Sequence, residues 1–428
     1  MSTILLAVIA VILCVLFRIL NVNSQPHKPL IYGRDKNFIE NILFIAPFLY
    51  EPYIPTRLWG FSGHVQTILH SLIGRLRCPW PIGGRISLVL PDKSTLTYDL
   101  YEPLGAEHED DVTVAICPGI GNTSESVYIR TYVHYSQRHG YRCAVLNHIG
   151  ALNSIPVTGN RIFSYGHTDD FNYMVENLLE RYPNTKLILV GFSLGGNLIT
   201  KYLGEDRKRP KNIIGVISIL NFITLLTMVY LLQWQNFRRF YLYIMTDNYR
   251  NIITRHKRML LSPEMKSRYS LDEKMIVSAG TLPDLDEAYS RKVHGFESVT
   301  ELYRWSSSAF YLDKIKTPMV FINAKDDPIV PEPLLPVVRE FVSRHDQTMY
   351  LELSHGGHLG FYEGGRFFAN PVTWLDRALV GLVGGLLMTH NKCSPKDTTT
   401  RSEMSLSDDE PDLIKSTIIY RDPLEKVA

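Results

Sequence analysis

Short apolar runs alternate with amphipathic segments through the middle of this 428-residue chain, and this alternation strongly constrains its fold. Residues 112–116 (VTVAI) and 185–191 (TKLILVG) have the length and apolar content of buried strands. Residues 169–183 (DDFNYMVENLLERYP) place their apolar side chains on one helical face. Strands that alternate with helices of this length predict right-handed βαβ units and a mostly parallel sheet flanked by helices, which is an α/β fold.

A segment without strand-like runs, at about residues 221–312, interrupts this alternation. It is helix-like and rich in Tyr, Arg and Met, so we expect a helical cap inserted into a sheet domain of residues 96–390. Residues 213–232 are apolar enough to resemble a membrane span. Because Asn221 interrupts them, and the alternation requires a strand there, we predict a strand followed by an apolar helix. Residues 391–428 are polar and predict a disordered tail.

An apolar run at residues 4–20 has the minimum length for a membrane span, provided that Arg18 reaches the interface. No basic residue precedes the run and no A-x-A cleavage site follows it. We therefore expect an uncleaved transmembrane signal-anchor over residues 1–20 rather than a signal peptide, followed by an arm of residues 21–95. Basic residues after the run favour a cytosolic domain, whereas a glycosylation sequon at Asn122 could be used only in a lumenal one, so the orientation stays open.

Charge and cysteine content exclude several classes of function. The chain has 45 basic and 43 acidic residues and no basic cluster, so we expect no nucleic-acid partner. Its five cysteines are widely spaced and contain no CxxC, which argues against a disulfide framework and a zinc site. Cysteines of this kind are more typical of a reducing compartment.

Residues 191–195 (GFSLG) match the motif G-x-S-x-G. This motif needs a tight turn from a strand into a helix, and glycines flank the serine because side chains there would clash. The turn would project the Ser193 Oγ above the sheet edge, near a helix N-terminus that favours developing negative charge. A packing turn is the alternative, but an apolar strand precedes the motif and a helix follows it. We therefore interpret Ser193 as a nucleophile.

A serine nucleophile needs a base and an acid that orients the base, and in this architecture the chain order is Ser, Asp or Glu, then His. Asp326 and Asp327 follow a strand-like run at residues 317–324. We choose Asp327 as the acid because Pro328 restricts it to an extended conformation. Asp326 is expected to be solvated or to cap a turn.

Two histidines, His355 and His358, lie in a glycine-rich loop after the last strand-like run. We choose His358 as the base, because Gly356 and Gly357 let the backbone pack closely while the ring reaches inward. His355 would support the loop. A metal site is the alternative for H-x-x-H, but no third ligand has suitable spacing, so we expect no metal and no cofactor. These loops would open at the same sheet edge as Ser193.

The tetrahedral intermediate of acyl transfer needs two backbone N–H donors. One expected donor is Leu194, which follows the nucleophile, and the other should come from the loop after the first strand. That loop is CPGIGNTS, residues 117–124, and Ile120 is our candidate within it. An ordinary glycine-rich turn is the alternative. A phosphate site is disfavoured because the loop has neither the Walker lysine nor the Rossmann spacing.

Several motifs, taken in order, resemble one known family. They are GHVQT (63–67), ICPGI (116–120), YRCAVLNHIGAL (141–152), VGFSLGGN (190–197), KYLGE (201–205), NAKDDPIV (323–330) and HGGHLGF (355–361). In these the chain is similar to the AB hydrolase 4 family of the α/β-hydrolase superfamily, over nearly its whole length before the tail. The resemblance implies an α/β-hydrolase fold, a triad of Ser193, Asp327 and His358, and hydrolysis of acylglycerol esters. It also implies a single-pass, type II attachment with the catalytic domain on the lumenal or extracellular side.

The sequence thus predicts a membrane-anchored serine hydrolase of lipid carboxylic esters, an acylglycerol lipase, with apolar cap residues 222–234 forming an acyl-binding wall. A non-catalytic lipid-binding or receptor-like protein on the same fold is the alternative. A thioesterase or an acyltransferase would share the acyl-enzyme. Some relatives carry an H-x-x-x-x-D acyltransferase motif, but Thr113 stands five residues after His108 here, which disfavours acyl transfer.

Overall fold

The computed structural model of the protein describes residues 3–70, 79–104, 110–220, 224–233, 237–330 and 332–393. Internal contacts divide the chain into two units, Met1–Asn391 and Lys392–Ala428. The elements below belong to the first unit, except for the last two residues of its final helix. The disordered tail expected over residues 391–428 lies outside the described residues after Cys393.

The described strands form one sheet in the spatial order β1-β9-β8-β7-β6-β4-β5-β3-β2. They are β1 (Leu30–Tyr32), β2 (Gly84–Val89), β3 (Thr95–Tyr101), β4 (Val112–Cys117), β5 (Arg142–Asn147), β6 (Lys186–Phe192), β7 (Ile213–Ile219), β8 (Met319–Ala324) and β9 (Thr348–Leu353). Strands β4 to β9 pair in parallel, whereas β1, β2 and β3 run antiparallel to their neighbours. The mostly parallel sheet is confirmed, and the antiparallel strands at its edges are an addition that the sequence analysis did not predict.

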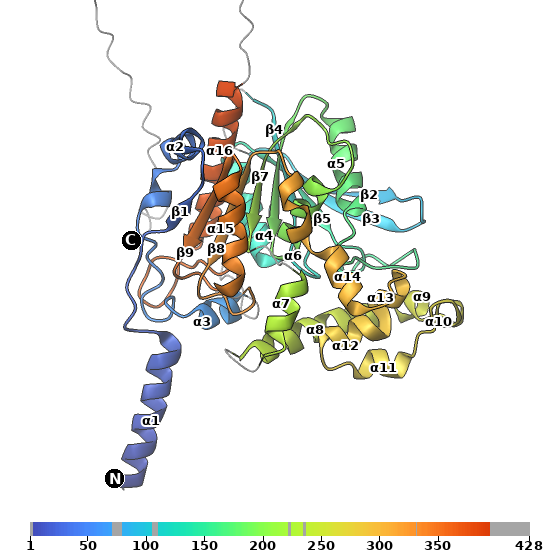
Figure 1. The fold of residues 1–428 in the computed structure, drawn as a ribbon, viewed down its shortest axis with the longest axis horizontal. Coiled ribbons are helices and arrows are strands. Elements are labelled where there is room, and N and C mark those ends of the chain that lie inside the picture. The colour runs from blue at the N-terminus through green and yellow to red at the C-terminus, as the bar shows by residue number, and fades with distance from the viewer. Residues whose placement is uncertain are drawn as a thin grey trace, which may run out of the picture. The chain divides into compact units, whose positions relative to one another are not determined.

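Helices cover both faces of the sheet (Figure 1). One face carries α2 (Lys36–Ile45), α4 (Val127–Arg138) and α16 (Trp374–Cys393), and the other carries α5 (Asp169–Arg181), α6 (Leu194–Gly204) and α15 (Leu335–Arg344). Strand β6 contributes to both cores, since Leu187 and Leu189 belong to one buried cluster and Ile188 and Val190 to the other. Successive side chains of a strand point to opposite faces, so a strand covered on both faces is apolar throughout.

The segment between β7 and β8 forms a cap, and every regular element among its described residues is helical. Its helices are α7 (Thr224–Leu231), α8 (Arg238–Arg255), α9 (Lys257–Leu260), α10 (Pro263–Tyr269), α11 (Glu273–Ser278), α12 (Leu282–Leu285), α13 (Arg291–Val293) and α14 (Val299–Ser306). Figure 1 shows α8 to α13 grouped at one end of the sheet. The described residues of 213–232 form β7 and α7, as predicted. Met228 and Leu231 of α7 are buried in the apolar core, and the acyl-binding wall expected of residues 222–234 stays a prediction.

Helix α1 (Thr3–Leu20) is followed by the arm, which contributes β1, α2, α3 (Gly63–Ile68) and β2. No helix in the described part of the chain has the length and apolar composition required to cross a membrane. The transmembrane signal-anchor predicted over residues 1–20 is therefore not supported.

The cap contains a buried carboxylate, Asp286, in a π-helical turn between α12 and α13. Three hydroxyl groups donate hydrogen bonds to it: Ser290 at 2.6 Å, Tyr303 at 2.6 Å and Tyr165 at 3.1 Å. Tyr165 belongs to the loop between β5 and α5, so this carboxylate joins the cap to the sheet domain. Burial raises the pKa of Asp286 to about 6, and the three hydroxyl groups oppose that rise.

We predict that this carboxylate lowers the free energy of unfolding as the pH rises from about 4 to about 6. An unfolded aspartate titrates near pH ~3.9, so between the two pKa values the folded state holds the extra proton and loses stability as the proton leaves. The effect amounts to about 3 kcal/mol across this window. Urea unfolding midpoints of Asp286→Asn should therefore depend less on pH than those of the wild type. The exposed Asp206→Asn variant should follow the wild type. Superimposable profiles for Asp286→Asn and wild type would contradict the prediction.

Candidate active site

Ser193 stands at the junction of β6 and α6 with φ 54° and ψ −114°, a backbone conformation that non-glycine residues rarely adopt. Its backbone N–H donates to the carbonyl of Ile219 on β7 at 2.8 Å. Strain of this kind persists only where the surrounding structure holds it in place. Here the two buried parallel strands β6 and β7 hold the turn, and the serine is carried to the carboxyl end of the sheet.

The two glycines of the motif are required by the close approach of backbone segments. A Cβ on Gly195 would collide with the carbonyl oxygen of Cys117 at the end of β4, and a Cβ on Gly191 would collide with the carbonyl of Gly195. No side chain can therefore be accommodated at either position without moving the backbone. This agrees with the clash that the sequence analysis gave as the reason for the flanking glycines.

The structure brings together the three residues predicted to act in catalysis. His358 Nε2 lies 2.8 Å from Ser193 Oγ, and His358 Nδ1 lies 2.8 Å from Asp327 Oδ2. An ionised carboxylate only accepts hydrogen bonds, so Nδ1 carries the proton and Nε2 is left to accept from the serine hydroxyl. The other oxygen of Asp327 accepts the backbone N–H groups of Ile329 (2.7 Å) and Val330 (3.0 Å), which fixes the carboxylate. This arrangement is capable of nucleophilic catalysis.

The two expected oxyanion donors stand close to this serine. Leu194 is the first residue of α6, where a backbone N–H has no partner within the helix. Ile120 follows Gly119, and a Cβ on Gly119 would lie 3.6 Å from the Ser193 Cβ, so this loop packs against the nucleophile. Tyr128 Oη accepts the N–H of Gly119 at 3.0 Å and steadies the loop. That Leu194 and Ile120 bind an oxyanion stays a prediction.

Asp326 is not the solvated or turn-capping carboxylate that we expected. It is largely buried, and its Oδ1 accepts the backbone N–H of Gly357 at 2.9 Å. Its Oδ2 faces Nδ1 of His355 at 3.5 Å, while Nε2 of His355 lies 2.9 Å from Ser24 Oγ. Burial raises the pKa of Asp326, and His355 opposes that rise. His355 therefore supports the loop, as expected, but does so through Asp326.

Sequence reasoning assigned no role to α3, which lies against this loop. A Cβ on Gly63 would collide with Asp326, and a Cβ on Gly357 would collide with the carbonyl of Gly63. His64 Nδ1 lies 2.9 Å from Tyr241 Oη of the cap, and the two rings stack. Burial lowers the pKa of His64, and the negative charges of Asp326 and Asp327 oppose this. The only signal in the sequence was the GHVQT motif that contributed to the family resemblance.

A cavity of about 280 Å³ lies beside the oxyanion loop, between Ile120–Asn122 and helix α8. Phe163, Tyr249 and Ile252 give it an apolar lining, and Arg255 is among its polar residues. The Asn122 side chain is half-buried and donates to the carbonyl of Ile120 at 2.9 Å, so the amide of the sequon is engaged within its own loop.

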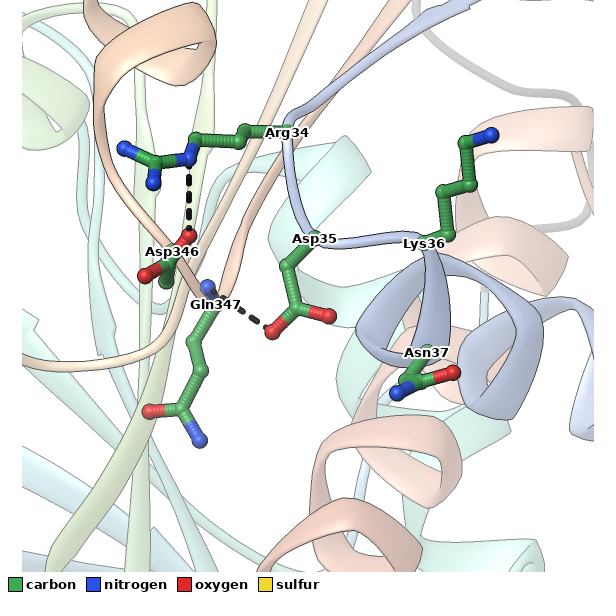
Figure 2. A pocket seen from close by; sticks show the side chains of 6 residues that line it. All are labelled: Arg34, Asp35, Lys36, Asn37, Asp346 and Gln347. Carbon is green, nitrogen blue, oxygen red and sulfur yellow. Dashed lines mark hydrogen bonds and ion pairs between the residues drawn. The ribbon is translucent and has the colours of Figure 1, made fainter.

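A larger hollow, of about 600 Å³, lies near the start of β9 (Figure 2). His358 instead follows the end of that strand. Figure 2 shows Arg34 paired with Asp346 at 3.4 Å, and the Asp35 carboxylate accepting the Gln347 N–H at 3.4 Å. Both side chains of the ion pair are largely exposed. We assign no function to this hollow. Among the described residues, no group of three His, Cys, Asp or Glu side chains could hold a metal ion.

Comparison with known proteins identifies relatives along most of the chain. Residues 112–365 match the family described as alpha/beta hydrolase fold. Abhydrolase domain-containing protein 2 of Drosophila melanogaster is 62% identical over 392 residues, which are 91% of this chain and 98% of that protein. Monoacylglycerol lipase ABHD2 of Homo sapiens is 41% identical, covering 92% of this chain and 94% of the relative. Monoacylglycerol lipase ABHD2 of Mus musculus is 40% identical, with corresponding coverages of 94% and 96%.

We predict that Gly195→Ala destroys the tight turn. The new Cβ cannot coexist with the Cys117 carbonyl, so β4 and α6 must separate and Ser193 must lose its position. Labelling by a fluorophosphonate probe should fall by about 100-fold or more, because a shift of ~1 Å in a reacting group already costs this much. Gly84→Ala is the matched control, since a Cβ there meets nothing within 4 Å. Labelling of Gly195→Ala at the wild-type rate would show that the turn tolerates a side chain.

Proposed function

The chain belongs to the alpha/beta hydrolase fold family, and two of its relatives are named monoacylglycerol lipase. From this premise we propose that it is a monoacylglycerol lipase using Ser193, His358 and Asp327. The observation that carries the proposal is the pair of 2.8 Å contacts that join these three side chains. The names of the human and mouse relatives support the choice of monoacylglycerol as substrate. The reaction releases glycerol and a fatty acid.

In the acylation step, Ser193 Oγ attacks the ester carbonyl carbon and His358 Nε2 takes the hydroxyl proton. The bond from Oγ to carbon forms as the carbonyl π electrons move to oxygen, which gives a tetrahedral oxyanion. Asp327 keeps Nδ1 protonated and stabilises the imidazolium that results. Because two backbone N–H groups hold the other oxygen of this carboxylate, it is oriented before the substrate arrives.

The N–H groups of Leu194 and Ile120 would stabilise the oxyanion, and the positive end of helix α6 adds to this effect. When the intermediate collapses, the bond from carbon to the glycerol oxygen breaks, and the proton on His358 Nε2 passes to the leaving oxygen. Water then enters, gives its proton to His358 and attacks the acyl-enzyme. The second collapse frees the fatty acid, and the proton returns to Ser193.

The cavity beside Ile120 is our candidate for the part of the site that receives the substrate. It adjoins the proposed oxyanion donor and combines apolar with polar side chains, as a ligand with both a hydrocarbon chain and hydroxyl groups requires. Met245 of α8 also lines it, and a flexible thioether adapts well to an acyl chain.

We also propose that α1 attaches the protein to a membrane, where a lipid substrate is concentrated. Every side chain from Ile4 to Ile19 is exposed, and apart from Arg18 all of them are apolar or small. An exposed apolar surface of this size on a soluble helix is unfavourable, and its burial in lipid would contribute about 25 cal/mol per Å².

Replacement of the nucleophile tests the proposed activity. We expect Ser193→Ala to reduce monoacylglycerol turnover by about 10³-fold or more, because a triad that loses its nucleophile retains little catalysis. Ser87→Ala, on the exposed side of β2, should turn over substrate at the wild-type rate. Acyl-CoA and short-chain esters are assayed in parallel. A clear preference for acyl-CoA would indicate a thioesterase, and ester turnover equal in wild type and Ser193→Ala would favour the non-catalytic alternative.

Removal of residues 1–20 tests the membrane proposal. The full chain should co-sediment with phosphatidylcholine vesicles, and the truncated chain should stay in the supernatant because it lacks the exposed apolar helix. Turnover of a water-soluble short-chain ester should be unchanged within about twofold, since α1 supplies none of the three proposed catalytic residues. Equal sedimentation of the two proteins would contradict the proposal. Retention of the full chain in vesicles after carbonate washing would separate insertion from surface binding.

A further inference from the structure

Two side chains from outside the histidine loop hold its backbone, the buried Thr67 and the partly buried Asp326. The N–H of His358 donates to Thr67 Oγ1 at 2.8 Å, and the N–H of Gly357 donates to Asp326 Oδ1 at 2.9 Å. These are successive backbone N–H groups, immediately before the imidazole side chain. The Cα of His358, from which the ring reaches both Ser193 and Asp327, is therefore fixed by α3 on one side and by the loop after β8 on the other.

The Thr67 hydroxyl is oriented to accept this hydrogen bond. Its own O–H donates to the carbonyl of Gly63 at 2.7 Å, one turn earlier in α3, so its lone pairs face the histidine loop. The side chain is completely buried, and no water can take the place of the hydroxyl without a rearrangement. If the Thr67 hydroxyl were lost, the buried His358 N–H would either stay unpaired, at a cost in free energy, or move to another acceptor.

Helix α3 is itself firmly held, which makes it a suitable support. Ser62 caps its N-terminus by accepting the N–H of Val65 at 3.3 Å. Gln66, adjacent to Thr67, donates to the carbonyl of Gly60 and accepts the N–H of Tyr362 at 2.9 Å. Tyr362 lies four residues after His358, so α3 accepts hydrogen bonds from the backbone of this segment at two points, His358 and Tyr362.

Asp326 is held in place by a chain of contacts on its other side. Its Oδ2 faces His355 Nδ1. His355 Nε2 lies 2.9 Å from Ser24 Oγ, and its ring makes a T-shaped contact with the Phe61 ring. Its charged and titratable neighbours are His355, Asp327, His64 and Tyr53. Ser24 follows the end of α1 by four residues, so the chain of contacts runs from the N-terminal segment to the histidine loop.

We propose that Thr67 and Asp326 are positioning residues for His358: each holds one of the two backbone N–H groups that set the imidazole between Ser193 and Asp327. The inference rests on the proposed function, since it assigns these residues an effect through the proposed general base. A base works only within hydrogen-bond reach of the proton it takes, and a displacement of ~1 Å costs about 100-fold in rate. The GHVQT segment thereby acquires a positioning role in the proposed reaction. Its Thr67 hydroxyl bonds to the Gly63 carbonyl and the His358 N–H rather than to Ser193 or Asp327.

Isosteric replacements at Thr67 test the proposal. Thr67→Val removes the acceptor and keeps the volume, and should lower both kcat and the rate of fluorophosphonate labelling by about tenfold, with KM unchanged within twofold. Thr67→Ser restores the hydroxyl and should return both rates to within about threefold of the wild type. Thr56→Val is the matched control, because the Thr56 hydroxyl is buried in the same arm and has no partner among the described residues. It should react like the wild type.

Asp326 supplies an independent pair of variants, in case Thr67→Val folds poorly. Asp326→Asn keeps an oxygen that can accept the Gly357 N–H and should retain most of kcat, whereas Asp326→Ala should lose it about as severely as Thr67→Val. Hydrogen exchange over residues 354–361 provides a readout without turnover. Exchange should be faster in Thr67→Val and Asp326→Ala than in Thr67→Ser and Asp326→Asn.

Equal kcat and equal exchange in Thr67→Val and Thr67→Ser would overturn the inference, as would losses that Thr56→Val reproduces. These results leave the proposed function intact, because wild type still labels and Ser193→Ala does not. If the wild type itself shows no Ser193-dependent labelling, the proposed function fails, and the inference fails with it.

Discussion

The close contact between the first turn of α6 and the end of β4 is the constraint on which the site depends. Gly195 lies against the Cys117 carbonyl with no room for a Cβ, and this contact forces the chain to turn sharply at Ser193. The strained serine is held by strands that are buried on both faces, so the energy that holds the turn comes from the core of the sheet rather than from the loop itself. Gly119, in the loop after β4, approaches the same serine. The proposed nucleophile and the loop that holds the expected donor Ile120 therefore both lie next to the contact between Gly195 and Cys117.

The central sheet, and the contact of Ser193, His358 and Asp327 that the structure shows, could be predicted because their signals are local. Strand β6 is apolar in every position that is buried, and the G-x-S-x-G motif follows it directly. The edge strands were missed because β1 has only three residues and β2 is largely exposed, so neither gives a clear periodicity. Asp326 was misjudged because its burial is produced by His355 and α3, which are remote in sequence, and adjacent carboxylates give no local sign of which neighbours they will meet.

The N-terminal arm is part of the site. Strand β1 pairs with β9, which leads into the histidine loop, and α3 holds that loop through Thr67 and Gln66. His64 of α3 also contacts Tyr241 of the cap, so this six-residue helix of the arm touches both the histidine loop and the cap. Short elements of this kind have little intrinsic stability and depend on tertiary contacts. The residues of such an element are chosen by the tertiary contacts they make. Helix propensity and apolar periodicity therefore did not indicate a function for α3.

Two Asp–His–Ser series occur side by side, and their surroundings explain why only one is assigned to catalysis. Asp327, His358 and Ser193 are joined at 2.8 Å and 2.8 Å, whereas Asp326, His355 and Ser24 are joined at 3.5 Å and 2.9 Å. Ser193 precedes the N-terminus of α6, where the helix dipole favours an oxyanion, while Ser24 lies beyond the C-terminus of α1, the end that disfavours negative charge. Ser193 is also strained against a glycine-rich loop that can supply a donor, and Ser24 is not among the residues with positive φ. The same three residue types are therefore arranged for nucleophilic catalysis in one place and hold a loop in the other.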